Sequence, residues 1–319
     1  MDIAYFNIIK IKENKIRKKY CILYEKQYFI VMDFLKFRDV RFAYQPVEDD
    51  VDEDGKQIIP PVIFDNFSAD LPGGFVSLVG PNGSGKSTFM LLAAGRILPE
   101  NGSVSLLGHD TASISEEERD ILASYIYQNM ELETEEKVSV LLDFVYKNGK
   151  HKGNAPAIRE ESGDFMEEIK SVFELESSME KKLCALSKGE MQRVLLAFSL
   201  LYGSLSIFMD EPLFALEEPQ KEKALAYLRD FCKKTGVTVY ISMHELDLTK
   251  KYAETVLLFY PNHDIDLGTV EEVLTNEDLE KAYGVPAAML KHSEIITREN
   301  IKAKDELVRK VNDIASSVD

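Results

Sequence analysis

The stretch Val79–Thr88, VGPNGSGKST, decides the fold. Positions 80–87 fit the pattern Gly-x-x-x-x-Gly-Lys-Ser/Thr, between an apolar run (75–79) typical of a buried strand and a run (87–97) typical of a helix. Such glycines let the backbone N–H groups wrap around phosphate oxygens, and the helix adds the positive end of its dipole. The lysine can reach the β- and γ-phosphates, and the next hydroxyl can ligate Mg²⁺. A chance glycine-rich turn is disfavoured by the strand and helix on either side. The residues expected around the phosphates are Gly80, Pro81, Asn82, Gly83, Ser84, Gly85, Lys86, Ser87 and Thr88.

Two adjacent carboxylates follow a second apolar run, in LSIFMDEP at positions 205–212. Asp210 ends the expected strand and is placed to hold Mg²⁺. Glu211 can polarise a water that attacks a γ-phosphate, which makes it the expected general base. Acidic pairs at strand ends are common in loops, so this pair takes its meaning from the phosphate loop.

The segment that discriminates between classes of nucleotide-binding protein is LSKGEMQRVLLA, residues 186–197. It resembles the signature of the ATP-binding-cassette (ABC) superfamily, LSGGQ followed by QR and a helix. Ser187 and Gly189 match, whereas Lys188 replaces a glycine and Glu190 replaces the glutamine. The resemblance implies that Ser187 and Gly189 of one subunit face the γ-phosphate of ATP held by another subunit, and it leaves the effect of Lys188 on closure open. The alternative role of Ser187, an ordinary helix N-cap, is compatible with this one, because a capped helix start favours phosphate charge.

Further positions match the family in the expected order along the chain. Tyr44 matches the aromatic that stacks on adenine, although a core or strand-pairing role is an alternative. His244, in YISMHE, matches the switch histidine that contacts the γ-phosphate. FALE (214–217) matches the segment at the dimer contact, with Glu217 in place of the usual aspartate.

Gln128, in YIYQN, matches the family glutamine that couples the nucleotide to the helical subdomain and a membrane partner. The expected Mg²⁺ ligands are Ser87, Gln128 and Asp210. The expected catalytic residues are Gln128, Glu211 and His244.

The resemblance covers roughly residues 34–290 and implies an α/β fold of the P-loop NTPase type. The implied fold has a mainly parallel core sheet, an antiparallel β subdomain and a helical subdomain. We expect the ATPase domain at 33–292, with the helical subdomain at roughly 112–200. A charged, helical tail follows at 293–319.

Residues 1–32 are expected to form a poorly ordered extension, with Met32 a natural start. A basic arm that lies on a membrane surface is the alternative. Beyond it, MDFLKFRDVRFAY predicts β-structure with a bulge near Arg38 and Asp39. The acidic run 48–54 predicts a solvated turn, and Pro61 in the place of a bidentate glutamate argues against a calcium loop.

Composition excludes several classes of function. The 319 residues carry 55 acidic and 38 basic side chains, a net charge of −17, which disfavours general nucleic-acid binding. Three widely separated cysteines indicate unpaired thiols in a reducing compartment. No apolar run approaches the length that crosses a bilayer, so another protein would supply any membrane span.

The segment 268–285, GTVEEVLTNEDLEKAYGV, resembles the cassettes of iron-siderophore, haem and cobalamin uptake systems. A surface helix–loop–helix shared by many cassettes is the alternative interpretation. The resemblance implies an ATP-hydrolysing subunit of an importer, peripheral on the cytoplasmic face of the membrane. Its partners would be integral-membrane permease subunits, a second ATPase subunit (identical or a paralogue) and, indirectly, a substrate-binding protein. A soluble ATP-dependent switch and an exporter subunit remain alternatives.

Overall fold

The computed structural model describes residues 34–46, 57–128, 130, 132, 134–150, 164–286 and 289–290. The expected extension at 1–32, the acidic turn at 48–54 and the tail at 293–319 lie outside these residues.

Two β-sheets form the frame of the molecule. The smaller sheet has four antiparallel strands in the order β2-β1-β4-β5. The larger has six strands in the order β10-β9-β3-β8-β7-β6, all parallel except β10. These sheets confirm the predicted parallel core and antiparallel subdomain. The strands are β1 (Leu35–Ala43), β2 (Val62–Leu71), β3 (Phe75–Val79), β4 (Asn101–Leu106), β5 (His109–Asp110), β6 (Ala123–Ile126), β7 (Ser206–Met209), β8 (Thr238–Ser242), β9 (Thr255–Phe259) and β10 (Ile265–Gly268).

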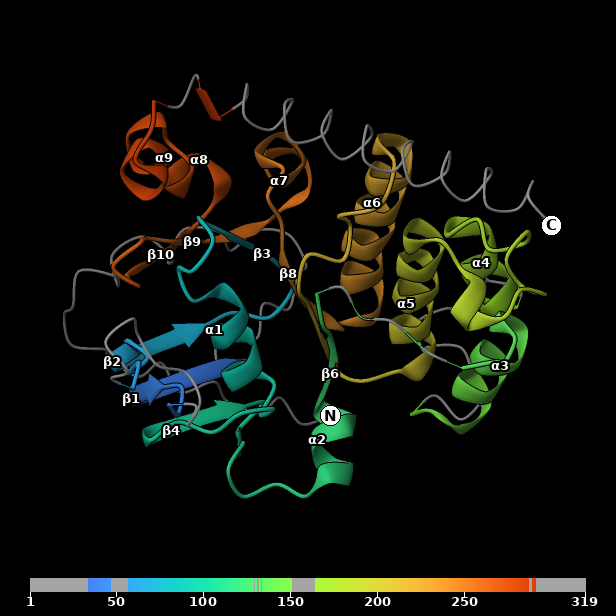
Figure 1. The fold of residues 1–319 in the computed structure, drawn as a ribbon, viewed down its shortest axis with the longest axis horizontal. Coiled ribbons are helices and arrows are strands. Elements are labelled where there is room, and N and C mark those ends of the chain that lie inside the picture. The colour runs from blue at the N-terminus through green and yellow to red at the C-terminus, as the bar shows by residue number, and fades with distance from the viewer. Residues whose placement is uncertain are drawn as a thin grey trace, which may run out of the picture.

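The helices divide into groups around the larger sheet. Figure 1 shows α3, α4 and α5 together on one side of the molecule and β1, β2 and β4 on the other, while α7, α8 and α9 gather at a third edge. None of the helices in the described ranges has both the length and the apolar character needed to cross a membrane. The helices are α1 (Lys86–Ala93), α2 (Glu116–Leu122), α3 (Val138–Asn148), α4 (Phe165–Val172), α5 (Lys188–Tyr202), α6 (Glu218–Thr235), α7 (Leu246–Tyr252), α8 (Val270–Val273) and α9 (Asn276–Tyr283).

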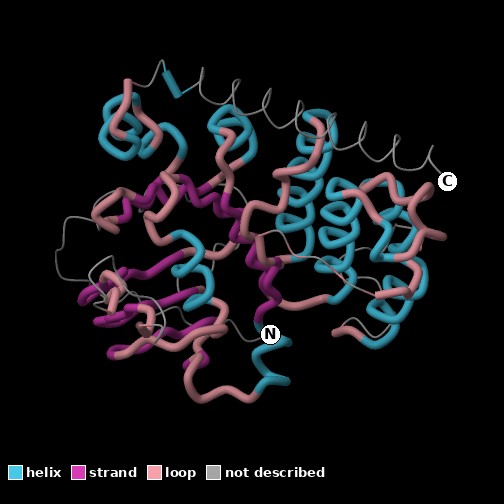
Figure 2. The backbone as a smooth tube through the Cα atoms, viewed as in Figure 1, coloured by secondary structure: helices cyan, strands magenta, loops and turns pink. Residues whose placement is uncertain are grey.

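The larger sheet separates two hydrophobic cores. Along β8, Val239 and Ile241 pack into the core formed with α3, α5 and α6, while Tyr240 between them packs into the core formed with β1 and α1. Strands buried on both faces read as continuous apolar runs. For this reason the runs in β3, β7 and β8 are visible in the sequence, and Figure 2 shows these strands passing through the middle of the molecule.

The segment 112–200, expected to be mainly helical, also contains a strand. Residues 123–126 form β6, which pairs in parallel with β7 at the edge of the larger sheet. The run is short and half polar, so it carries little strand signal of its own. The helices of this part of the chain that follow β6 are α3, α4 and α5.

The predicted bulge in the first strand is present. Asp39 has a left-handed φ of 49°, and the pairing of β1 with β2 shifts register between Phe37 and Val40. The Asp39 N–H donates to Ser68 Oγ at 2.7 Å, so the bulged backbone has a partner.

Candidate active site

The phosphate loop follows β3 and leads into α1. At Gly80 φ is 149°, and an added Cβ would lie 2.6 Å from the Phe259 carbonyl oxygen, so only glycine fits beside β9. Gly85 also has a left-handed φ, 100°, directly before the first residue of α1. The loop therefore follows a path that requires its glycines, and it ends where a helix dipole begins.

Lys86 is buried beneath this loop. Its Nζ donates to the carbonyl oxygens of Gly80, at 2.7 Å, and of Pro81, at 3.0 Å. Burial lowers the pKa of Lys86, and the charges of Glu211 and Asp210 partly oppose this shift. The ammonium is thus held between the loop and the two carboxylates, where it can meet a phosphate.

Asp210 lies at the end of β7 and is fixed by the neighbouring strand. The Ser242 hydroxyl, at the end of β8, donates to Asp210 Oδ1 at 2.7 Å and accepts the Glu211 N–H at 2.8 Å. All three groups lie at the carboxyl edge of the sheet, where open α/β sheets bind ligands. Ser242 is not among the residues predicted from the sequence, although a hydroxyl that ends an apolar strand is a signal that could identify it.

Glu211 is the meeting point of three strand ends. Its Oε2 accepts from Gln128 Nε2 at 2.7 Å, and its Oε1 lies 2.6 Å from His244 Nε2. Gln128 follows β6 and His244 follows β8, so the structure brings together the three residues predicted to be catalytic. The backbone of Glu211 has a left-handed φ of 48°, uncommon for a residue with a side chain.

Electrostatics keep the Glu211 carboxyl ionised. Burial would raise its pKa, but the hydrogen bond and charge of His244, the charge of Lys86 and the hydrogen bond from Gln128 outweigh burial and lower the pKa. An ionised carboxylate in this position can accept a proton from water.

The oxygen atoms near the loop suit a hard cation. Ser87 offers a hydroxyl, Asp210 a carboxylate, and Gln128 an amide oxygen, since its Nε2 already serves Glu211. Within the described residues, no group of three or more His, Cys, Asp or Glu side chains could hold a metal ion. These few oxygen ligands fit Mg²⁺, which is usually held by one or two carboxylates together with phosphates and water.

Tyr44 lies just beyond β1 and beside the start of α1. The residue is 43% exposed, and its hydroxyl is 3.1 Å from Thr88 Oγ1. Phe42 contacts the ring edge-to-face at 5.0 Å. The exposure rules out the buried-core alternative, and the position after the strand leaves a ring surface near the phosphate loop on which a base can stack.

The signature segment begins α5. Ser187 caps the helix, because its hydroxyl accepts the Glu190 N–H at 3.3 Å, and the Glu190 carboxylate accepts the Ser187 N–H at 3.0 Å. Gly189 is packed so closely that an added Cβ would lie 2.9 Å from the Ala215 carbonyl oxygen. Lys188 is exposed. The N-cap role predicted for Ser187 is thus present, and the lysine lies at an exposed position of the turn, where its side chain meets solvent.

The signature residues stand apart from the phosphate loop of the same chain. Within the described residues, no hydrogen bond links Ser187 or Gly189 to that loop or to Glu211. The 214–217 segment is nevertheless tied to α5, since the Ala215 N–H donates to Gln192 Oε1 at 2.7 Å.

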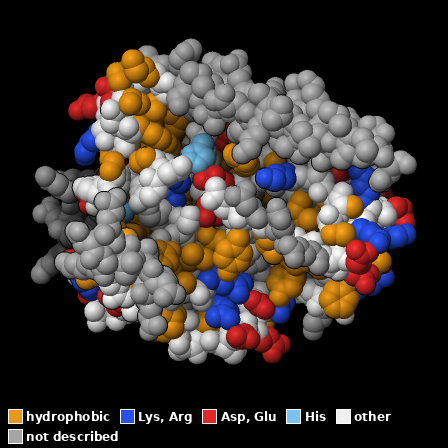
Figure 3. Space-filling view, in the orientation of Figure 1, with side chains coloured by type: hydrophobic (Ala, Val, Ile, Leu, Met, Phe, Trp, Pro, Cys, Tyr) orange, Lys and Arg blue, Asp and Glu red, His pale blue; other side chains and the backbone are white. Residues whose placement is uncertain are grey.

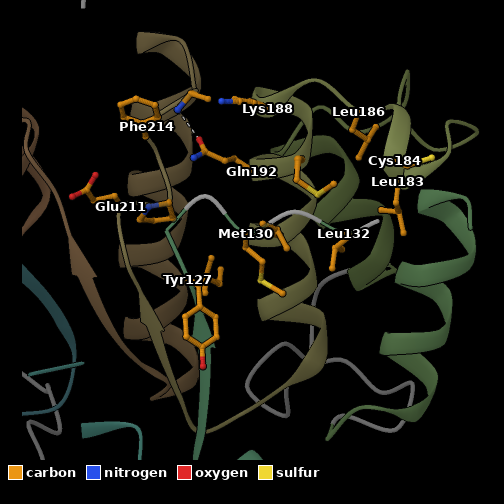
Figure 4. Close-up of a pocket in the computed structure, with 15 residues that line it drawn as sticks. Tyr127, Met130, Leu132, Leu183, Cys184, Leu186, Lys188, Gln192, Glu211 and Phe214 are labelled. Atoms are coloured by element: carbon orange, nitrogen blue, oxygen red, sulfur yellow. Dashed lines mark hydrogen bonds between the residues drawn. The ribbon is translucent and has the colours of Figure 1, made fainter. Parts of the chain in front are cut away.

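A groove of about 400 Å³ runs from Glu211 between α5 and the side chains of Tyr127, Met130 and Leu132. Figure 4 shows Tyr127, Met130 and Leu183 along its walls, with Glu211 and Phe214 toward one end. The face in Figure 3 likewise carries hydrophobic side chains next to acidic side chains and a histidine near its middle. The groove does not include the phosphate loop; it meets Glu211 at one end and also borders Leu186 and Lys188 of the signature segment.

Comparison with known proteins agrees with this geometry. The family model described as "ABC transporter" matches residues 64–214. The hemin import ATP-binding protein HmuV of Gloeobacter violaceus is 30% identical over 234 residues, which cover 70% of this chain and 82% of that protein. Among solved structures, the dimeric ATP-binding cassette MJ0796 bound to ADP and Pi superposes with a TM-score of 0.60 at 22% identity, over 74% of this chain and 99% of that one. A bacterial Atm1-family ABC exporter with ATP bound superposes with a TM-score of 0.58 at 20% identity, over 75% of this chain and 39% of that one.

The two solved structures show only that the fold is shared, because their sequence identity to this chain is low. The hemin import relative and the family model match the amino-acid sequence, and they show the family. The chain therefore belongs to the ABC transporter family, as an ATP-binding subunit with ATPase activity.

Proposed function

We propose that this chain powers a membrane importer, and that the cargo is an iron chelate, haem or cobalamin. The support is the hemin import relative, together with the 268–285 segment, which folds into the short helices α8 and α9. The segment resembles the same uptake group. The exporter neighbour keeps an exporter subunit as the second candidate.

Hydrolysis rests on one observation, the convergence of Gln128 and His244 on Glu211. In the proposed reaction, a water oxygen attacks the γ-phosphorus and the bond to the β-phosphate oxygen breaks. The water proton passes to the Glu211 carboxylate, and ADP and phosphate leave. His244 holds Glu211 through Oε1 and senses the γ-phosphate.

Binding of ATP uses the remaining residues of the site. Tyr44 stacks on adenine, and residues 80–88 surround the phosphates, with Lys86 moving from the loop carbonyls to the β- and γ-phosphates. Ser87, Gln128 and Asp210 would hold Mg²⁺. The cation, when bound, supplies charge neutralisation for the phosphates.

The partner subunits follow from the incomplete site. Ser187 and Gly189 face the nucleotide of a second ATPase subunit, so two subunits enclose two ATP molecules head-to-tail. Movement on closure passes through the Gln128 segment to an integral-membrane permease, which receives cargo from a substrate-binding protein. This places the chain on the cytoplasmic face of the membrane, as a peripheral subunit.

Two variants test the hydrolytic part of the proposal. Glu211→Gln should bind ATP, form a stable dimer in size-exclusion chromatography, and lose at least 100-fold in turnover, since it keeps the shape but cannot take a proton. Lys86→Ala should lose ATP binding itself. A Glu211→Gln variant with unchanged turnover would show that another group is the base.

The transport part is tested by purifying the tagged chain from native membranes and identifying the proteins that accompany it. Recovery of a polytopic membrane protein with a substrate-binding protein supports the importer, and recovery of a polytopic protein alone favours the exporter. Soluble partners alone would favour an ATP-dependent switch. This function is an alternative because Lys188 and Glu190 replace the glycine and the glutamine of the family signature. Robust basal turnover that Lys86→Ala abolishes would count against that switch.

A further inference from the structure

We propose that a buried ion pair, Lys221 with Glu245, positions His244 for catalysis and couples it to the segment 214–217. The inference rests on the function proposed above. The Lys221 Nζ donates to Glu245 Oε1, and the two side chains are only 6% and 15% exposed. Charged side chains are rarely this buried unless paired, and a buried pair is weak evidence for stability alone.

The ion pair joins the N-terminal ends of two helices. Lys221 lies in the first turn of α6, and its N–H donates to the Glu217 carbonyl oxygen at 2.9 Å. Glu245 is the residue before α7, and its carbonyl oxygen accepts the Thr249 N–H at 2.9 Å. A cation near a helix N-terminus is opposed by the helix dipole, so Lys221 gains nothing from α6 itself. The favourable electrostatic partner of the Lys221 ammonium is therefore the Glu245 carboxylate.

Glu245 of the ion pair adjoins the candidate active site. Glu245 follows His244 in the chain, and His244 Nε2 lies 2.6 Å from Glu211 Oε1. A shift of the Glu245 backbone therefore moves the imidazole against Glu211. Because a misplaced catalytic group can reduce the rate strongly at unchanged substrate binding, this contact affects turnover first.

Lys221 of the ion pair is connected with α5, the helix that begins in the signature. Lys221 is held to Glu217, which ends the segment that begins at Phe214. Within that segment, Ala215 is hydrogen-bonded to Gln192 of α5 and lies against Gly189. Packing contacts, hydrogen bonds and two short stretches of chain thus connect Gly189, which is expected to face the second subunit's ATP, with the general base of this subunit. Lys221 and Glu245 are positioning residues at the middle of that path.

A matched control exists on the same two helices. Lys251 of α7 pairs with Glu222 of α6 at 2.9 Å, but its side chains are 54% and 42% exposed. This pair joins the same two helices, and Glu222 is next to Lys221 in sequence. Among the residues that the structure describes, no hydrogen bond connects the pair with the His244 loop. Lys251→Met with Glu222→Gln therefore reports what loss of a link between α6 and α7 does by itself.

The experiment compares kcat and KM for ATP in Lys221→Arg, in the neutral double variant Lys221→Met/Glu245→Gln, and in the control double variant. Lys221→Arg keeps the buried charge but displaces its donor atoms, and the double variant leaves no unpaired charge, so both should fold. We expect each to lower kcat by roughly 10-fold or more while KM changes less than about 3-fold, and the control to stay within about 2-fold. The fold is checked by thermal unfolding.

The second readout is the imidazole itself. In ¹⁵N-histidine spectra, assigned among the five histidines with a His244→Gln variant, the His244 Nε2 signal should move in the Lys221 variants and not in the control. Wild-type kcat together with an unmoved His244 signal in both Lys221 variants would overturn the proposal. Failure of the proposed function looks different, because Glu211→Gln would then hydrolyse ATP at the wild-type rate or fail to dimerise with ATP.

Discussion

At the scale of single residues, the site depends on groups that hold the reactive carboxylates rather than on those carboxylates alone. Ser242 is fully buried and serves both Asp210 and the backbone of Glu211. The left-handed backbone of Glu211 needs such support, because sparsely populated conformations persist only where neighbours determine them.

Replacing Ser242 with alanine should therefore affect both stability and catalysis. The change leaves the buried Glu211 N–H and one Asp210 oxygen without this partner, at a cost of about 1–3 kcal/mol. We expect the urea midpoint to fall and kcat to drop more than 10-fold, as measured by unfolding and phosphate release.

The control is Ser199→Ala. Ser199 is equally buried, but its hydroxyl only donates to the Leu196 carbonyl oxygen within α5. It should leave kcat unchanged. If Ser242→Ala kept wild-type kcat while losing stability, Ser242 would be a packing residue only.

At the scale of elements, the start of α5 shows how the signature tolerates its two departures. Glu190 completes a capping box with Ser187 and also accepts from Lys181 at 2.7 Å and Ser178 at 2.9 Å. Burial would raise the pKa of Glu190, but these hydrogen bonds, with that from the Ser187 backbone, lower it to about 2. The carboxylate thus secures the helix start.

This shift predicts a pH-dependent contribution to stability. Because the pKa of Glu190 is depressed in the folded state, its ionised carboxylate stabilises the protein at pH values above 4.5, the ordinary pKa of a glutamate. This contribution is lost as the pH falls from 4.5 toward about 2. Glu190→Gln should therefore destabilise the chain by on the order of 1–3 kcal/mol at pH 7 and by clearly less at pH 3.5. Urea unfolding at the two pH values measures this, and a constant difference would contradict it.

The crowding at Gly189 predicts a second effect in the same turn. Gly189→Ala would raise helix propensity, but the new methyl group meets the Ala215 carbonyl oxygen, and relief of that contact must displace α5 or the 214–217 segment. We expect a net loss of about 1 kcal/mol or more and a fall in ATPase rate. Lys188→Ala, one residue earlier and exposed, should change stability by less than about 0.5 kcal/mol.

The sequence predicted the elements whose signal is local and missed those fixed by packing. Strands β3, β7 and β8 are apolar runs, and the glycine pattern located the start of α1. Strand β6 was not predicted, since Ala123–Ile126 is identified only by its pairing with β7. Among site residues, Gln128, Glu211 and His244 were found through the family pattern. Ser242 and the Lys221–Glu245 pair were not, because their partners lie 32 and 24 residues away in the chain.

At the scale of the whole molecule, the phosphate loop and the signature are held by separate sets of contacts. Within the described residues, Lys86 and Ser187 share no hydrogen bond. Under the proposed function, each complete site combines the phosphate loop of one subunit with the signature of another. Head-to-tail symmetry then supplies two equivalent sites.

Mixing two inactive variants tests this arrangement. Lys86→Ala and Ser187→Arg should each abolish turnover, yet a mixed dimer places one intact phosphate loop opposite one intact signature. An equimolar mixture should recover up to about a quarter of wild-type activity, because half of the dimers are mixed and half of their sites are intact. Mixed dimers seen by native mass spectrometry without any recovery would contradict independent composite sites.

The position of β3 in the larger sheet has a consequence for synthesis on the ribosome. The strand that carries the phosphate loop is buried at every residue, yet Gly74 just before it donates to Thr238, 164 residues later. The four-stranded sheet is complete once residue 110 has emerged, whereas β3 waits for β8 and β9. During that interval an apolar strand lacks its neighbours, which is the condition under which nascent chains aggregate. A chaperone that binds extended apolar segments should therefore crosslink to Phe75–Val79 on stalled chains that end before residue 238, and should release chains that extend beyond residue 268.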